Sequence, residues 1–275
     1  MSVEIDALYK NARAVLWVED PETRSWLEAL WFGQAPTIEI MVAGGHPNVN
    51  AVCQQALDYG VTNVFGLVDQ DFGTSNRDRW QVLPPHERVY RLDVHEFENL
   101  LLVPDSLSGC LLNIGKRTSP EIETRIFQEA EKLAWWVACA RFLADTKLAS
   151  RKDFPPNPNL NTVQSLATAQ AYVVEFGWFK TTAASCRALA DPVQISTALT
   201  AAHTAATAAL GDGTWRKSFP GKEIFRAISG WVYSVRPTNS NVIMDLVKSV
   251  GDWQRNNDVP TQAKDLRAAI LDRSH

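Results

Sequence analysis

The sequence predicts an α/β protein with a mainly parallel β-sheet flanked by helices, followed by a mostly helical C-terminal region. Short apolar runs rich in strand-forming residues alternate with segments that have apolar residues at helical spacing. Such alternation is typical of parallel strands joined by right-handed helical crossovers. After Leu102 the strand pattern ends. We therefore expect one domain over residues 1–105 and a second, mostly helical region over residues 106–275 that packs on it or completes it.

The elements of the first region follow from local patterns. Each expected strand is a short apolar run bounded by polar, glycine or proline residues, and each expected helix has apolar residues three or four positions apart. The expected strands cover residues 14–18, 37–43, 61–68 and 88–92, and the expected helices cover residues 22–32 and 46–59.

The second region is expected to be helical. Its predicted helices cover residues 120–145, 193–210 and 261–272, and another opens at the turn near Pro220 and continues through Ile228. The proline- and asparagine-rich residues 153–161 are expected to form a linker or surface loop.

The composition is that of a globular protein with a buried core. Of the 275 residues, 45% are hydrophobic and 21% are charged, which excludes the disordered and fibrous classes. The formal net charge is -4, so no overall positive field indicates nucleic-acid binding. A metal-dependent nuclease is still compatible with this charge, because the cation meets the phosphate and basic residues are needed only locally.

Cysteine usage and hydropathy indicate a cytoplasmic protein. The four cysteines, Cys53, Cys110, Cys139 and Cys186, include no C-x-x-C pair, which argues against a zinc ribbon, a thioredoxin-like motif or a disulfide framework. The sequence shows neither a secretory leader nor the run of ~18 uncharged apolar residues that spans a bilayer. We therefore expect reduced thiols and no membrane contact.

Acidic residues follow three of the expected strands. Glu19 follows the first strand, Asp69 and Asp71 follow the third, and Glu98 follows the fourth, with Glu96 as a substitute for Glu98. Ligands of parallel sheets bind at the C-terminal strand ends, and carboxylate oxygens suit Mg²⁺ or Mn²⁺. Taken singly, a D-x-D pair is also typical of surface turns, and Glu19 could simply cap the following helix.

Two later segments could add positive charge to such a site. Lys222 is a candidate to stabilise charge on a scissile phosphate, and a solvated lysine in the first turn of a helix is the alternative. Trp215, Arg216 and Lys217 combine a stacking surface with positive charge, as in sites for single-stranded nucleic acid. Burial of Trp215 in the core, with solvated neighbours, is the alternative there.

The ordered acidic set resembles that of TOPRIM domains, which have a Glu after the first strand, a D-x-D after a later strand and further acids downstream. The matching segments are LWVED (16–20), LVDQDF (67–72) and HEFENLLL (95–102). The last is similar to the E-N box of AriB-like TOPRIM nuclease subunits in phage-defence loci, which are related to OLD-family nucleases, and GKEI (221–224) resembles a late motif of such proteins. The first motif departs from the family pattern, because Asp20 and Thr23 stand where Gly and an acid are usual. Either Asp20 or Glu22 substitutes for the missing acid, or one metal position is weakened.

The resemblance implies a TOPRIM-like fold and a nuclease that cleaves DNA or RNA with Mg²⁺ or Mn²⁺. Its implied metal ligands are Glu19, Asp69, Asp71 and Glu98 or Glu96, and Lys222 would assist catalysis. The implied partner is a separate ATPase that controls this effector subunit of an antiphage system, and a homodimer is compatible with it. The chain itself has no G-x-x-x-x-G-K-[ST] loop for ATP.

Two other interpretations stay open. Residues 15–24 also resemble the opening strand and acidic pair of a response-regulator receiver domain, with Asp69 as phosphoacceptor. A receiver needs a Ser or Thr at the end of its fourth strand and a Lys-Pro at the end of its fifth, and neither feature is found between Arg88 and Lys116. The altered first motif also keeps open a catalytically inactive TOPRIM-like scaffold that recognises a partner.

Overall fold

The computed structural model describes residues 9, 12–70, 81–83, 88–150, 162–175, 191–234 and 240–274. The chain divides into two compact units: the first contains the described residues within 1–70, 77–123 and 221–275, and the second those within 124–220. This grouping differs from the expected division at residue 105, because residues 106–123 and the C-terminal helices cluster with the sheet.

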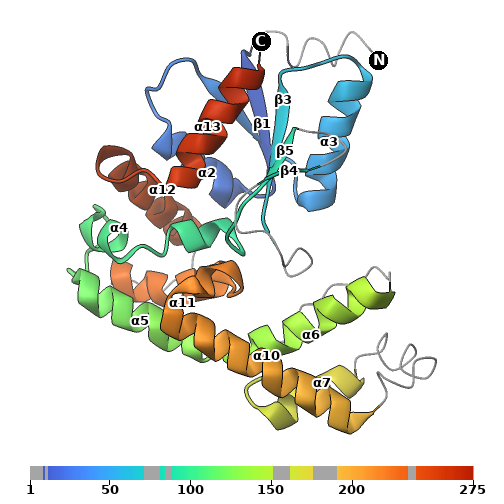
Figure 1. The fold of residues 1–275 in the computed structure, drawn as a ribbon. Coiled ribbons are helices and arrows are strands. Elements are labelled where there is room, and N and C mark those ends of the chain that lie inside the picture. The colour runs from blue at the N-terminus through green and yellow to red at the C-terminus, as the bar shows by residue number, and fades with distance from the viewer. Residues whose placement is uncertain are drawn as a thin grey trace. The chain divides into compact units, whose positions relative to one another are not determined.

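The first unit is built on a five-stranded sheet with the order β2-β1-β3-β5-β4 (Figure 1). The strands are β1 (Ala14–Val18), β2 (Ile38–Val42), β3 (Val64–Val68), β4 (Gln81–Leu83) and β5 (Val89–Arg91). The pairs β1–β2, β1–β3 and β3–β5 are parallel, whereas β4 is antiparallel to β5. The prediction of a mainly parallel sheet flanked by helices is therefore confirmed, and all four expected strands are present.

Helices cover both faces of the sheet. Helix α3 (His46–Asp58) lies on one face, and α2 (Pro21–Leu30) and α13 (Thr261–Arg273) lie on the other (Figure 1). The apolar face of α3 presents Val49, Cys53 and Ala56 to Val15 and Val64 in a buried cluster. This burial explains why the strands read as almost continuous apolar runs, since parallel strands are covered on both sides.

Helix α12 (Ser240–Asn256), which was not predicted, packs against α2. The indole N–H of Trp26 donates to Gln254 Oε1 at 2.8 Å, and Gln254 Nε2 donates to the Leu100 carbonyl at 2.8 Å. All three residues are buried or nearly so. Gln254, near the C-terminal end of α12, therefore joins α2 to the segment after β5.

The remaining elements of the first unit are short except for α11. They are the 3₁₀ helix η2 (Phe97–Leu100), α4 (Pro104–Gly109) and α11 (Gly221–Tyr233), which begins where a helix was expected after Pro220.

The second unit is helical in its described residues. It contains α6 (Ala134–Ser150), α7 (Leu166–Glu175), α10 (Pro192–Asp212) and η3 (Thr214–Lys217), while α5 (Ser119–Glu131) spans the boundary between the units. The single helix expected over 120–145 is wrong: α5 ends at Glu131, and a tighter turn, with the Leu133 N–H donating to the Ala130 carbonyl at 2.9 Å, precedes α6. The expected loop at 153–161 lies outside the described residues.

Three cysteines can be compared with the expectation of reduced thiols. Cys53, Cys110 and Cys139 are buried and form no disulfide, and Cys186 lies outside the described residues. Among the residues that the structure describes, no helix is both long and apolar enough to cross a membrane.

Candidate metal centre

Acidic side chains gather at the C-terminal ends of three neighbouring parallel strands. Glu19 follows β1, Asp69 follows β3, and the acids on either side of Phe97 follow β5. Because β1, β3 and β5 are adjacent and parallel, these ends lie at one edge of the sheet. We call the set the acidic cluster; its members are Glu19, Asp20, Asp69, Glu96 and Glu98.

Hydrogen bonds between backbone and carboxylate link the three strand ends. The Asp69 backbone N–H donates to Glu19 Oε1 at 2.9 Å, which joins the end of β3 to the end of β1. The Phe97 N–H donates to Asp69 Oδ1 at 3.0 Å, which joins the segment after β5 to the end of β3. The positions of Glu19 and Asp69 therefore follow from the backbone itself.

Asp20 has two roles. Its Oδ1 accepts from the Thr23 N–H at 2.7 Å and from the Thr23 hydroxyl at 2.8 Å, so it caps the N-terminus of α2. Its Oδ2 lies 4.0 Å from Lys222 Nζ. Asp20 also contributes to the raised pKa of Asp69, whereas Glu22 is not among the charges that raise it. Of the two acids proposed to substitute in the first motif, Asp20 is the one that belongs to the cluster.

The N-terminus of α11 meets the cluster through Glu96. Glu96 Oε2 accepts from the Lys222 backbone N–H at 2.8 Å, and a carboxylate is favourable at this end of a helix. Gly221 makes the approach feasible, because a Cβ atom there would lie 2.6 Å from the Asn99 backbone nitrogen. Only glycine therefore allows α11 to start so close to η2.

Lys222 supplies the positive charge of the site. Its Nζ lies 4.0 Å from Asp20 Oδ2 and 4.0 Å from Glu98 Oε1. Burial alone would lower the pKa of Lys222, but the carboxylates of Glu98, Asp20 and Glu22 outweigh it and the pKa is raised. Lys222 is therefore held as an ammonium ion and is not the freely solvated lysine of the alternative interpretation.

Charge repulsion and burial oppose ionisation of the acids. The pKa of Asp69 lies well above its usual value because the carboxyl is buried and because Glu19, Glu98, Glu96 and Asp20 are close. The pKa of Glu98, whose residue is 4% exposed, is raised by burial and then by Glu96 and Asp20, while Lys222 lowers it. A cation in the cluster would relieve this repulsion.

The donor chemistry of the cluster fits Mg²⁺ or Mn²⁺, which prefer carboxylate oxygens. Within the described part of the chain, however, no three His, Cys, Asp or Glu side chains are arranged to coordinate one ion. Asp71, the second acid of the D-x-D pair, lies outside the described residues.

Glu96 and Glu98 do not lie on one extended segment. Glu96 is extended, with φ −137° and ψ 156°, but Glu98 lies within η2. Both residues are nevertheless close enough to Asp69 to raise its pKa.

The Trp215 segment does not form an open stacking surface. Trp215 is 1% exposed, and Arg216 lies over its ring with 4.7 Å between the guanidinium carbon and the ring centroid. The alternative of a buried tryptophan with polar neighbours is therefore the one that the structure supports.

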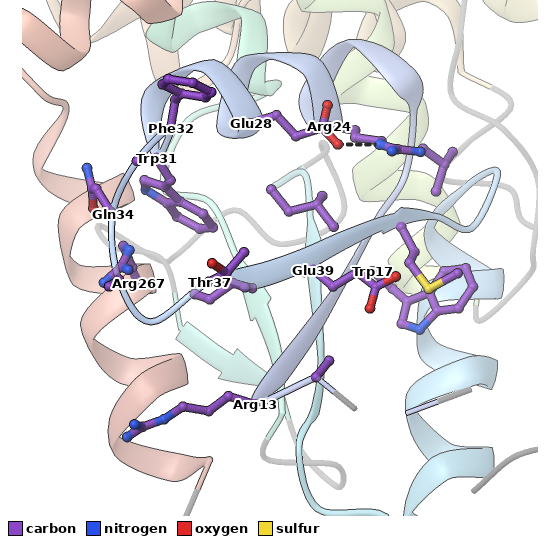
Figure 2. Close-up of a pocket in the computed structure, with 17 residues that line it drawn as sticks. Arg13, Trp17, Arg24, Glu28, Trp31, Phe32, Gln34, Thr37, Glu39 and Arg267 are labelled. Carbon is purple, nitrogen blue, oxygen red and sulfur yellow. Dashed lines mark hydrogen bonds and ion pairs between the residues drawn. The ribbon is translucent and has the colours of Figure 1, made fainter. Parts of the chain in front are cut away.

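A groove of about 1300 Å³ lies along the edge strand β2, apart from the acidic cluster (Figure 2). Its lining comes from β1, β2, α2, the 31–37 segment and α13. Arg24 and Glu28 form an ion pair at 2.7 Å there, and Arg267 donates to the Pro36 carbonyl at 2.7 Å. None of the carboxylates of the acidic cluster lines it. The groove thus belongs to the sheet edge and not to the candidate metal centre.

Comparison with models of known protein families gives no match for this chain, and a search of curated proteins gives none either. The TOPRIM resemblance therefore rests on the sequence motifs.

Proposed function

We propose that this chain is a metal-dependent nuclease that hydrolyses phosphodiester bonds in DNA or RNA. The observation that supports the proposal best is the gathering of carboxylates from three adjacent strand ends beside one lysine. Perturbed titratable groups clustered in this way are typical of functional sites. The ordered motifs that resemble TOPRIM nucleases point to the same chemistry.

In this proposal Glu19, Asp69 and Glu98, with Asp71, hold one or two Mg²⁺ or Mn²⁺ ions. A bound ion would polarise the phosphate and lower the pKa of a bound water. The chain fixes the carboxylates of Glu19 and Asp69 through the Asp69 and Phe97 N–H groups. Lys222, at the start of α11, places an ammonium beside them that can stabilise negative charge on the phosphate oxygens.

The resemblance to AriB-like proteins extends the proposal to the biological role. On that basis the chain is the effector subunit of an antiphage defence system, controlled by a separate ATPase. The ATPase senses infection and this subunit cuts nucleic acid.

The test is cleavage of DNA, RNA and transfer RNA by the purified protein with Mg²⁺, with Mn²⁺ or with a chelator. We expect cleavage only with metal. We expect Asp69→Asn to lower the cleavage rate by at least ~100-fold, because loss of even an outer-shell partner of a metal ligand costs about 10–100-fold. Asp245→Asn, an exposed acid on α12, is the matched control and should cleave like the wild type. Equal cleavage by Asp69→Asn, or cleavage in chelator, would contradict the proposal.

The alternatives give different outcomes. A receiver would be labelled by acetyl phosphate at Asp69; it would also need a fifth parallel strand, and the position beyond β5 in the described sheet is occupied by antiparallel β4. An inactive scaffold would cleave none of the substrates, and the double variant Asp69→Asn/Asp71→Asn would still bind its partner.

A further inference from the structure

We propose that the Lys222 side chain is an internal counter-ion of the acidic cluster, which a divalent cation must displace in order to bind. The inference rests on the proposed metal-dependent function and describes how that same site is regulated. The inference follows from the position of the Lys222 ammonium group between two carboxylates that follow different strands.

Lys222 Nζ lies at equal distance, 4.0 Å, from Asp20 Oδ2 and Glu98 Oε1. Asp20 follows β1 and Glu98 follows β5, so the ammonium bridges acids that the fold brings together from separate strands. The Glu98 side chain is 5% exposed, and a buried carboxylate without a nearby positive charge is strongly destabilising. Lys222 thus supplies the charge that the cluster needs when it holds no metal.

The ammonium is tethered but can move. The Lys222 backbone is fixed by its hydrogen bond to Glu96, and Gly221 is packed against Asn99. The side chain is 32% exposed, and both Nζ distances exceed those of a direct hydrogen bond. A flexible four-carbon stem can therefore swing the ammonium out of the cluster while α11 stays in place.

A divalent cation and Lys222 compete at the Glu98 carboxylate, which is a proposed metal ligand and lies 4.0 Å from Lys222 Nζ. Two positive charges within a few ångströms repel each other, so each weakens the binding of the other by the same factor. Once displaced, Lys222 is available to a phosphate, so metal loading and phosphate binding become coupled.

The first test is Mg²⁺ and Mn²⁺ affinity, measured by calorimetry on the full chain. We expect Lys222→Met to bind the metal about 5-fold or more tightly than the wild type, the usual lower range for coupled sites. Lys264→Met removes an exposed lysine on α13 and should bind like the wild type. If the wild type binds the metal and Lys222→Met binds it equally or more weakly, the inference is overturned, while the proposed metal site is still supported. Binding by neither protein overturns the proposed function as well.

The second test uses the wild-type protein and does not depend on how the variant folds. Amine acylation at each lysine is followed by mass spectrometry in chelator and in saturating Mg²⁺. We expect Lys222 to react faster with Mg²⁺, because the ammonium leaves its carboxylate partners, while the rate at Lys264 stays constant. An unchanged or slower rate at Lys222 under conditions where calorimetry detects binding overturns the inference.

Discussion

At the level of single residues, the acidic cluster makes the stability of the protein depend on pH. The folded-state pKa values of Asp69 and Glu98 are raised, first by burial and then by neighbouring carboxylates. The folded protein therefore holds these protons more tightly than the unfolded chain does. Their contribution to stability is fully present below the unfolded-state pKa values, near ~4, and is lost as pH rises through the folded-state values.

Replacing Asp69 by Asn should stabilise the metal-free protein at neutral pH. The Asn side-chain oxygen can still accept from the Phe97 N–H, as Asp69 Oδ1 does at 3.0 Å, while the charge that repels Glu19 and Glu98 is removed. In thermal denaturation with chelator, we expect a higher midpoint for Asp69→Asn than for the wild type at pH 8 and a smaller difference at pH 4. The control Asp245→Asn should have the same midpoint as the wild type at pH 4 and at pH 8. The argument would be contradicted if the change in midpoint between pH 4 and pH 8 were the same for the wild type and for Asp69→Asn.

The sequence could predict part of the site and not the rest. Glu19, Asp69 and Glu98 follow recognisable strands, so the topology of a parallel sheet alone brings them to one edge. Asp20 carried a weaker signal, because an acid after a strand is also a helix cap, and the structure gives it both roles. The contact of Lys222 with the cluster could not be derived from local pattern, since 126 positions separate it from Glu96.

At the level of elements, the N-terminus of α11 depends on Glu96. Its carboxylate accepts from the Lys222 N–H at 2.8 Å, and loss of an N-terminal cap costs about 1 kcal/mol. We expect Glu96→Ala to lower the free energy of unfolding by about that amount relative to Glu96→Gln, in which the amide oxygen can still accept. Both variants remove the same charge, so the comparison isolates the hydrogen bond. Equal denaturation midpoints for the two would show that the bond contributes nothing.

The contact between α3 and β3 depends on Gly66. A Cβ atom at this position would lie 2.5 Å from Val49 Cγ1 and 3.1 Å from Cys53 Sγ. We expect Gly66→Ala to destabilise the protein by about 1–3 kcal/mol, the usual cost of overpacking a core. Val49→Ala creates space there, so in urea denaturation the double variant should be more stable than the sum of the two single effects predicts. Strict additivity would mean that the clash is relieved elsewhere.

The predictability of the elements follows from how clearly each is bounded. The four expected strands are short apolar runs closed by turn residues, and all four are present, whereas β4 was not predicted. The break between α5 and α6 carries no proline or glycine at Lys132 and Leu133, so nothing local marks it. Helix α12 was missed although Val242, Leu246 and Val250 recur at helical spacing, a signal that could have located it.

At the level of the whole molecule, the C-terminal helices complete the unit that begins with β1. Helix α12 approaches α2 so closely that a Cβ atom on Gly251 would lie 3.0 Å from the Trp26 carbonyl. Arg255 also donates to the Ala29 carbonyl at 2.7 Å. These contacts join residues more than two hundred positions apart, which is why the expected boundary at residue 105 does not match the compact units.

Gln254 is the buried polar link in this arrangement. It accepts from Trp26 Nε1 and donates to the Leu100 carbonyl, both at 2.8 Å, and is 1% exposed. Gln254→Leu keeps a similar volume but leaves a buried N–H and a buried carbonyl without their partner, at about 1–3 kcal/mol each. We therefore expect a loss of roughly 2–6 kcal/mol in the free energy of unfolding, measured by urea denaturation. Asn256→Leu, an exposed change on the same helix, should have a small effect. An equally small effect of Gln254→Leu would mean that water or a shifted side chain satisfies both groups, and that this link does not hold α12 against α2 and the segment after β5.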